Sequence, residues 1–112
     1  MPLRLAVVIP TLNEAANVVP LLDTLRETLR GIEWEAIFVD DNSPDGTAAV
    51  IREIARNDLR VRVLQRIGRE GLASACIEGM LATAAPYVAV IDADLQHPPE
   101  VLAGHDEREV GA

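Results

Sequence analysis

The stretch YVAVIDADLQHPPE, residues 87–100, decides the predicted fold of this chain. Its uninterrupted apolar run ends in two carboxylates one residue apart, Asp92 and Asp94, and Gln96 and a proline pair follow. A short apolar run bounded by turn residues indicates a strand that is buried on both faces of a sheet. Two carboxylates at the end of such a strand repel each other, so they favour a counter-charge, most simply a divalent cation with oxygen ligands. Asp94 and Gln96 offer oxygens of the type that Mg²⁺ or Mn²⁺ prefers.

The composition is that of one globular domain, because 49% of the 112 residues are hydrophobic and the sequence has no repeat or low-complexity tract. No apolar run approaches the roughly 20 residues that a membrane-spanning helix requires. The first residues also lack the small-residue cleavage site of a secretory signal. We therefore expect a cytoplasmic protein.

The charged residues exclude several classes of function. The formal net charge is −8 and there is no basic patch interleaved with aromatic residues. No binding to nucleic acid is therefore expected, because such binding depends on neutralising phosphates. All ten basic residues are arginines. The absence of lysine excludes a Walker-type phosphate loop, a Schiff-base enzyme and a response-regulator receiver. The single cysteine, Cys76, excludes an internal disulfide and a cysteine-based zinc site.

Apolar runs and helical periodicity alternate along the chain. Strands are predicted at residues 5–9, 34–39, 61–64 and 87–91. Helices are predicted at residues 18–30, from after residue 47 to about residue 56, and at residues 72–84. This alternation predicts an α/β fold, a parallel sheet of four strands in the order 3-2-1-4 with right-handed crossovers and helices on both faces. Residues 98–100 are predicted to begin a short helix, because proline suits the first helical position. The polar residues that follow predict no fifth strand, so the domain covers residues 1–102 and a polar tail covers residues 103–112.

Four polar clusters each follow a predicted strand directly. They are residues 11–14, 40–47, 66–71 and 92–96. In open α/β sheets, ligands bind beyond the carboxyl ends of the strands, in the crevice where the strand order reverses. With the order 3-2-1-4, this crevice lies between the first and fourth strands. It would be lined by residues 10–14 on one side and 92–94 on the other.

The segment DDNSPDGT, residues 40–47, has two interpretations. A calcium loop is excluded, because the position that requires a bidentate glutamate holds Arg52. Ser43 or Asp45 could simply cap the helix that follows. Alternatively, carboxylates of this segment could accept hydrogen bonds from a ribose or a base, which would make it a nucleotide-binding loop.

Two arginines, Arg66 and Arg69, lie among glycines after the third predicted strand. Their guanidinium groups and the free backbone amides around them could bind phosphate oxygens, or both side chains could be solvated. Glu78 and the arginines of the first two helices are assigned to ordinary surface. His97 is assigned to a turn, because proline follows it and hard cations favour oxygen ligands.

Four ordered motifs resemble those of the family 2 inverting glycosyltransferases. They are VIPTLNE at residues 8–14, VDDNSPDGT at 39–47, GLASA at 71–75 and DADLQHPPE at 92–100. The last is most similar to the motif of the dolichol-phosphate, or polyprenol-phosphate, mannosyltransferases. The resemblance runs from about residue 5 to residue 102, nearly the whole chain.

The resemblance implies a GT-A, Rossmann-like fold that binds a nucleoside diphosphate sugar such as GDP-mannose, together with Mg²⁺ or Mn²⁺. The cation would act as a Lewis acid on the leaving group, and the sugar would pass with inversion to a polyprenol phosphate acceptor. The residues expected to contact the nucleotide are Pro10, Leu12, Asn13, Glu14, Asp41, Asp92 and Ala93, joined by Arg69 from the third loop. The expected metal ligands are Asp92, Asp94 and Gln96, and the expected catalytic residues are Asp92 and Asp94.

The chain also departs from the family pattern. Leu12 occupies a position where tyrosine is common, which would weaken stacking on the base. Family members are usually about twice as long, so we expect this chain to be their nucleotide-binding half. Acceptor contacts and peripheral association with the cytoplasmic face of the membrane would come from the missing C-terminal part. The alternative is a catalytically silent nucleotide-binding or interaction module.

The fourth strand carries a further expectation about assembly. If it lies at the edge of the sheet, its unpaired backbone groups would favour pairing with another chain. A homodimer through the edge of the strand at residues 87–91, or a tendency to aggregate, is therefore expected.

Overall fold

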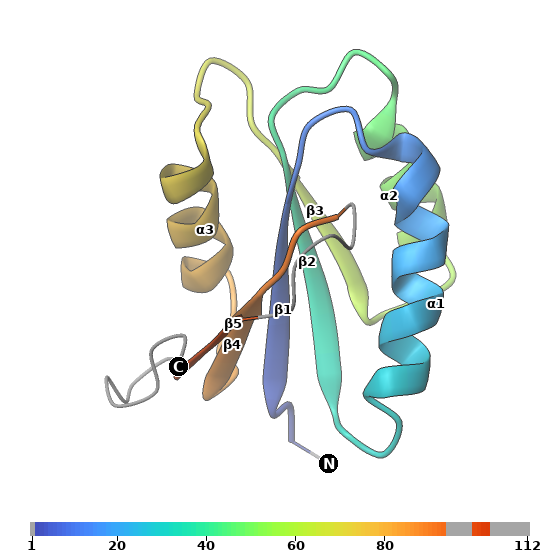
Figure 1. Cartoon of the computed structure of the whole chain (residues 1–112), viewed down its shortest axis with the longest axis vertical. Helices are drawn as coiled ribbons and strands as arrows, with labels where there is room; N and C mark the ends of the chain where they lie inside the picture. Colours follow the sequence, from blue (N-terminus) through green and yellow to red (C-terminus); the bar gives the residue numbers. More distant parts are fainter. Residues whose placement is uncertain (1, 94–99, 104–112) are drawn as a thin grey trace.

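Four parallel strands form the centre of the sheet, as the sequence predicts. The computed structural model describes residues 2–93 and, for the backbone, residues 100–103. The strands are β1 (Leu5–Thr11), β2 (Trp34–Asp40), β3 (Val61–Gln65), β4 (Tyr87–Val90) and β5 (Glu100–Ala103). They form one sheet in the order β3-β2-β1-β4-β5 (Figure 1). The predicted order 3-2-1-4 of the parallel strands is confirmed.

Helices cover both faces of this sheet. The 3₁₀ turn η1 (Ala15–Asn17) leads into α1 (Val18–Thr28), which lies with α2 (Thr47–Ala55) on one face, whereas α3 (Leu72–Leu81) lies on the other (Figure 1). Pro20 sits in the first turn of α1, where its missing N–H is not needed. α1 and α3 end slightly earlier than predicted, at residues 28 and 81. None of the helices in the described part of the chain is long and apolar enough to span a membrane.

The side chains of the central strand β1 alternate between two hydrophobic clusters. Val7 and Ile9 pack with α1 and α2, whereas Ala6 and Val8 pack with α3. All four are at most 2% exposed, and burial of a valine or isoleucine side chain contributes roughly 1.5–3 kcal/mol. Because both faces of the strand are covered, its sequence is a continuous apolar run rather than an alternating one.

The close approach of α3 to the sheet depends on Gly79. A Cβ atom at this position would overlap Cγ1 of Val8 and lie 3.2 Å from Cγ2 of Val39. Ala75, one turn earlier on the same face of the helix, is 1% exposed. These small residues let the helix settle directly on β1 and β2, and they bring its first turn to the carboxyl end of the sheet.

The strand β5 corrects the prediction for the end of the chain. It pairs with β4 in the antiparallel direction, with Glu100 opposite Val90 and Ala103 opposite Tyr87. The predictions of no fifth strand and of a helix that includes Glu100 are therefore wrong, and residues 98–99 lie outside the described part. The physical reason is that an edge strand offers unpaired N–H and C=O groups to any chain that can lie beside it. Because β5 covers the edge of β4, the homodimer hypothesis loses the open edge on which it rested.

Candidate functional site

The loops that follow β1 and β2 are joined at their base by a buried carboxylate. Asp40, the last residue of β2, has no exposed surface. It accepts hydrogen bonds from the hydroxyl groups of Thr11 (2.7 Å) and Ser43 (2.6 Å) and from the backbone N–H of Ser43 (2.9 Å). Three donors compensate the carboxylate for its removal from water. These bonds fix the start of the second loop against the end of β1.

Three further hydrogen bonds connect the same two loops. The backbone N–H groups of residues 13–15 donate, in order, to Ser43 Oγ (2.8 Å), Thr47 Oγ1 (3.1 Å) and Asp45 Oδ2 (3.1 Å). Asn13 adopts a φ of 56°, a left-handed conformation that asparagine tolerates better than most residues. The loops after β1 and β2 therefore form one structural unit.

Asp45 lies two residues before the start of α2. Its Oδ1 accepts hydrogen bonds from the backbone N–H (3.0 Å) and the hydroxyl group of Thr47. The hydrogen bond from the Thr47 hydroxyl is the main cause of the lowered pKa of Asp45. The N-cap of α2 is Gly46, and in the described part of the chain no side chain caps this helix with a hydrogen bond. The capping interpretation is therefore wrong for both Ser43 and Asp45, and Ser43 serves the junction between the loops.

Asp41, an expected nucleotide contact, is half-buried and faces the loop after β3. Its Oδ1 accepts a hydrogen bond from Nε of Arg66 (2.7 Å), and its Oδ2 accepts one from the backbone N–H of Gly71 (3.1 Å). The hydrogen bond from Arg66 is the main cause that lowers the pKa of the Asp41 carboxyl, against the opposing effect of burial. Asp41 is therefore an ionised acceptor held in one orientation.

Arg66 is buried, which neither interpretation of the loop arginines anticipated. Its side chain is 1% exposed and also donates to Ser74 Oγ (2.8 Å), Glu78 Oε2 (2.9 Å) and the carbonyl oxygen of Gly71 (2.9 Å). The assignment of Glu78 to ordinary surface is wrong, because hydrogen bonds from Arg69 and Arg66 lower its pKa to about 2. One feature of the sequence could have indicated these two partners of Arg66. Ser74 and Glu78 are four residues apart, which places both on one face of a helix.

Arg69 stays accessible at the edge of this cluster. Its side chain is 60% exposed, and its Nε and Nη2 atoms each lie 3.0 Å from an oxygen of Glu78. A guanidinium group in such a bidentate pair can exchange the carboxylate for a phosphate, because both anions accept two parallel hydrogen bonds. The role of Arg69 as a phosphate contact stays a prediction.

A hollow of about 480 Å³ opens beside Asp41 at the carboxyl ends of β1 and β2. Its lining residues are Pro10, Thr11, Leu12, Asp41, Glu70, Gly71, Leu72 and Ala75. The hollow brings together three of the expected nucleotide contacts, Pro10, Leu12 and Asp41. Leu12 is 58% exposed, so its apolar side chain is available to a ligand. The remaining wall comes largely from the GLASA motif at residues 71–75, which the sequence marks without showing which side chains face inward.

A second hollow of about 460 Å³ adjoins the first. Asp41 and Glu70 line both, and Arg69 lines the second. Asn13 and Glu14, in contrast, line neither hollow. The Glu14 carboxylate accepts a hydrogen bond from the side-chain amide of Asn17 (2.6 Å). These two residues belong to the loop junction rather than to the wall of the cavity.

Asp92 and Ala93 follow β4 at the same end of the sheet. The backbone N–H of Ile91 donates to the carbonyl oxygen of Val8 (3.1 Å), so the chain runs beside β1 up to the residue before Asp92. The Asp92 side chain is exposed, and Ala93 is 3% exposed. Neither residue lines the two hollows described above, so the crevice between β1 and β4 stays a prediction.

The expected metal ligands are only partly within the described residues. Asp94 and Gln96 lie outside them. Among the side chains that the structure describes, no group of three or more His, Cys, Asp or Glu could hold a metal ion. Mg²⁺ is usually held by one or two carboxylates together with waters and substrate phosphates, and Asp92 is the one member of the expected set that the structure describes. The metal site therefore stays a prediction.

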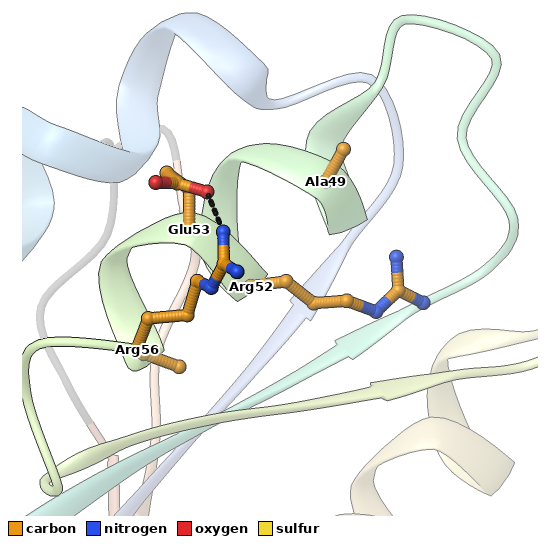
Figure 2. A pocket seen from close by; sticks show the side chains of 5 residues that line it. Ala49, Arg52, Glu53 and Arg56 are labelled. Carbon is orange, nitrogen blue, oxygen red and sulfur yellow. Dashed lines mark hydrogen bonds and ion pairs between the residues drawn. The ribbon is translucent and has the colours of Figure 1, made fainter.

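An open hollow of about 510 Å³ lies over α2 (Figure 2). It is lined by Ala49, Arg52, Glu53, Ala55 and Arg56. Figure 2 shows the guanidinium group of Arg56 turned towards Glu53, at 3.1 Å. Both side chains are more than 70% exposed, and such pairs contribute about 0–1 kcal/mol. This hollow is the solvated face of the helix, as predicted for its arginines.

The sequence model of glycosyl transferase family 2 matches residues 6–105, which include the loops after all four parallel strands. The chain belongs to this family. It is 39% identical over 100 residues to a dolichol-phosphate mannosyltransferase of Pyrococcus furiosus, covering 89% of this chain and 28% of that protein. It is 35% identical over 105 residues to a dolichol-phosphate mannosyltransferase of Saccharomyces cerevisiae, covering 91% of this chain and 39% of that protein. The family 2 domain described here therefore spans between about a quarter and two fifths of the length of these relatives.

Solved structures of glycosyltransferases share the fold. The mannosyltransferase PcManGT from Pyrobaculum calidifontis, in complex with GDP-Man and Mn²⁺, has a TM-score of 0.69 at 27% identity, covering 81% of this chain and 27% of that one. Glucosyl-3-phosphoglycerate synthase from Mycobacterium tuberculosis, in complex with Mn²⁺, UDP and glucosyl-3-phosphoglycerate, has a TM-score of 0.65 at 26% identity, covering 80% of this chain and 33% of that one. The expected GT-A, Rossmann-like fold is confirmed.

Proposed function

We propose that the chain binds the nucleotide-sugar donor of an inverting glycosyltransferase and that the hollow beside Asp41 receives the nucleoside. The observation that carries this proposal is the meeting of the loops after β1, β2 and β3 around one hollow at the carboxyl end of a parallel sheet. Ligands of open α/β sheets bind at this end. Membership of glycosyl transferase family 2 supports a sugar as the group transferred.

A GDP-mannose-like donor and a polyprenol or dolichol phosphate acceptor agree best with the similarities. Two relatives are named dolichol-phosphate mannosyltransferase, and a structural neighbour is a mannosyltransferase in complex with GDP-Man and Mn²⁺. A lipid phosphate is already anionic and needs no general base to become a nucleophile. Such an acceptor is a membrane lipid, and because we expect the protein to be cytoplasmic, we propose that the reaction takes place at the cytoplasmic face of the membrane.

The described residues divide the work of holding the donor. Asp41 accepts hydrogen bonds from the base or the ribose, because its carboxylate is ionised and lies at the wall of the hollow. Pro10 and Leu12 provide apolar contacts to the base. Asp92, exposed after β4, contacts the ribose and the diphosphate, and Arg69 exchanges its carboxylate partner for a diphosphate oxygen.

Asp92, Asp94 and Gln96 are the proposed ligands of Mg²⁺ or Mn²⁺. Carboxylate and carboxamide oxygens are the donors that these cations prefer. When bound, the cation supplies Lewis acidity for the departing diphosphate. By holding the cation, Asp92 and Asp94 would position the diphosphate end of the donor, which is the sense in which both are expected to be catalytic.

Isothermal titration calorimetry tests the binding proposal. The chain is titrated with GDP and with UDP in the presence of Mn²⁺, Mg²⁺ or EDTA. We expect binding that requires the metal, prefers GDP and is lost in Asp94→Ala. Asp23→Ala is the matched control, because Asp23 is an exposed carboxylate on α1. The proposal is contradicted if neither nucleotide binds under any of these conditions.

Incubation with labelled GDP-mannose and polyprenol phosphate separates an enzyme from a binding module. Transfer of label to the lipid supports the complete reaction. Metal-dependent binding without transfer supports the alternative, a catalytically silent nucleotide-binding module. Flotation of the chain with vesicles that contain polyprenol phosphate measures its membrane association in the same preparation.

A further inference from the structure

Arg66 is the largest side chain among the fully buried ones in the described part of the chain. A guanidinium group is tolerated in the interior only where its N–H donors are satisfied. Four hydrogen bonds of 2.7–2.9 Å do this, to Asp41, Ser74, Glu78 and the carbonyl oxygen of Gly71. Arg66 lines the second hollow, but its side chain is 1% exposed and its donors are taken by these acceptors, so the guanidinium group does not present them to a ligand.

The contacts of Arg66 converge on two residues of the proposed nucleoside site. Asp41 and Gly71 both line the hollow. Gly71 is held twice, because its carbonyl oxygen accepts from Arg66 and its N–H donates to Asp41. Its φ of 115° is a conformation that residues with a side chain rarely adopt. One closed set of hydrogen bonds therefore fixes the end of β2 to the start of α3.

The charges around this set are balanced. Arg66 contacts Asp41 and Glu78, and Arg69 pairs with Glu78, so two cations face two carboxylates. Glu70 lines the same hollow as a further carboxylate. Without Arg66, the Asp41 carboxylate would lose the hydrogen bond that does most to stabilise its charge and would still be repelled by Glu78. The backbone N–H of Gly71 is the other donor that the structure shows for its side chain.

We infer that Arg66 is a positioning residue for the nucleoside. It acts through Asp41 and Gly71, whose orientation it fixes at the wall of the hollow, and it does not touch the ligand. This role rests on the proposed nucleotide binding and differs from both phosphate binding and solvation. Ser74 and Glu78, on the first turns of α3, complete the set of partners that keeps the guanidinium group in place.

Calorimetry with GDP and Mn²⁺ is the first test. Affinity is expected to fall on the order of tenfold or more in Arg66→Gln, as for other small displacements of a binding group. Arg66→Lys restores part of the loss, because the ammonium group keeps the charge but cannot reach all four acceptors. The matched control is Arg62→Gln, which removes an arginine that pairs with Glu35 (3.0 Å) and donates to the carbonyl oxygen of Ala82 (2.7 Å) near the start of β3. Unchanged affinity in Arg66→Gln overturns the inference.

The amide resonance of Gly71 provides a second test that needs no ligand. Because the Gly71 N–H donates to Asp41, its chemical shift follows the protonation of that carboxyl. The pH at the midpoint of this titration is expected to rise in Arg66→Gln. In Arg66→Lys it should lie between the values of the unaltered chain and of Arg66→Gln, and in Arg62→Gln it should equal that of the unaltered chain. A midpoint that stays in place in Arg66→Gln overturns the inference, even where affinity falls, because Arg66 would then act by direct contact.

These readouts separate the inference from the proposed function. If the unaltered chain binds no nucleotide, the proposed function fails, and the Gly71 titration still decides whether Arg66 orients Asp41. If Arg66→Gln does not fold, Arg66→Lys and Ser74→Ala decide. The second of these removes one acceptor of Arg66 without a change in charge, and a smaller rise of the same midpoint is expected. A fixed midpoint in both variants overturns the inference.

Discussion

Replacement of Asp40 by asparagine is expected to loosen the junction between the loops after β1 and β2. The change keeps the shape of the side chain, removes its charge and replaces one acceptor oxygen by an NH₂ donor. If the NH₂ group faces the backbone N–H of Ser43, two hydrogen-bond donors oppose each other and that hydrogen bond is lost. If it is turned the other way, the hydroxyl hydrogens of Thr11 and Ser43 lose their common acceptor, Oδ1.

The magnitude follows from these contacts. A hydrogen bond to a charged group contributes about 1.5–3 kcal/mol, and a buried donor left unpaired costs about 1–3 kcal/mol. At least one of the three hydrogen bonds is lost in either orientation, and water cannot replace it because Asp40 has no exposed surface. The free energy of unfolding should therefore fall by about 2 kcal/mol. Nucleotide affinity should fall as well, because Ser43 also holds the backbone of Asn13.

Urea unfolding followed by far-ultraviolet circular dichroism measures the loss. The control is Asp23→Asn, since the Asp23 side chain is 68% exposed and pairs with Arg26 on the surface of α1. Such a pair contributes less than about 1 kcal/mol. A loss in Asp40→Asn no larger than that in Asp23→Asn would refute the reasoning, because the buried carboxylate would then not depend on its three donors.

Three further predictions concern α3 and the hollow. Gly79→Ala should lower the Tm, because overlap with Val8 costs about 1–3 kcal/mol and exceeds the roughly 1 kcal/mol gain in helix propensity; an equal or higher Tm in thermal unfolding contradicts this. The pKa of Glu78 falls from 4.5 to about 2 on folding, so its stabilisation is complete above about pH 4.5 and is lost as the pH falls towards 2. Glu78→Gln should flatten this acid limb of the curve of unfolding free energy against pH, and parallel curves for the two proteins would speak against it. Leu12→Tyr should tighten GDP binding several-fold, because base–aromatic stacking contributes about 1–3 kcal/mol and the side chain is exposed; a calorimetric titration without any gain would show that the base lies elsewhere.

The parts of the candidate site that follow a single strand were predictable from the sequence. Pro10, Leu12 and Asp41 each come within a few residues of a buried apolar run, and parallel strands bring their carboxyl ends to one edge of the sheet. The structure places all three around the same hollow. Asn13 and Glu14 have the same position in the sequence, yet they serve the loop junction, because their backbone N–H groups are taken by Ser43 and Thr47.

The end of the sheet shows why other features were not predictable. β5 is four residues long, too short to display a period of its own, and its conformation is decided by the free edge of β4 beside it. A local preference, such as that of proline for the start of a helix, contains no information about whether a partner strand lies alongside. The hydrogen bonds between the strands come from backbone groups that almost every residue carries, so the pattern of side chains does not predict the pairing.

The sequence by itself determined the parallel sheet, its order and the edge at which ligands would bind, because burial on both faces leaves continuous apolar runs that need no partner to be recognised. Only the tertiary structure decided the role of Arg66. Its two carboxylate partners lie 25 and 12 residues away in the chain, and nothing local distinguishes an arginine that meets water from one that meets Asp41 and Glu78. A buried charge is permitted only where distant groups supply its hydrogen bonds, and the fold alone brings those groups together.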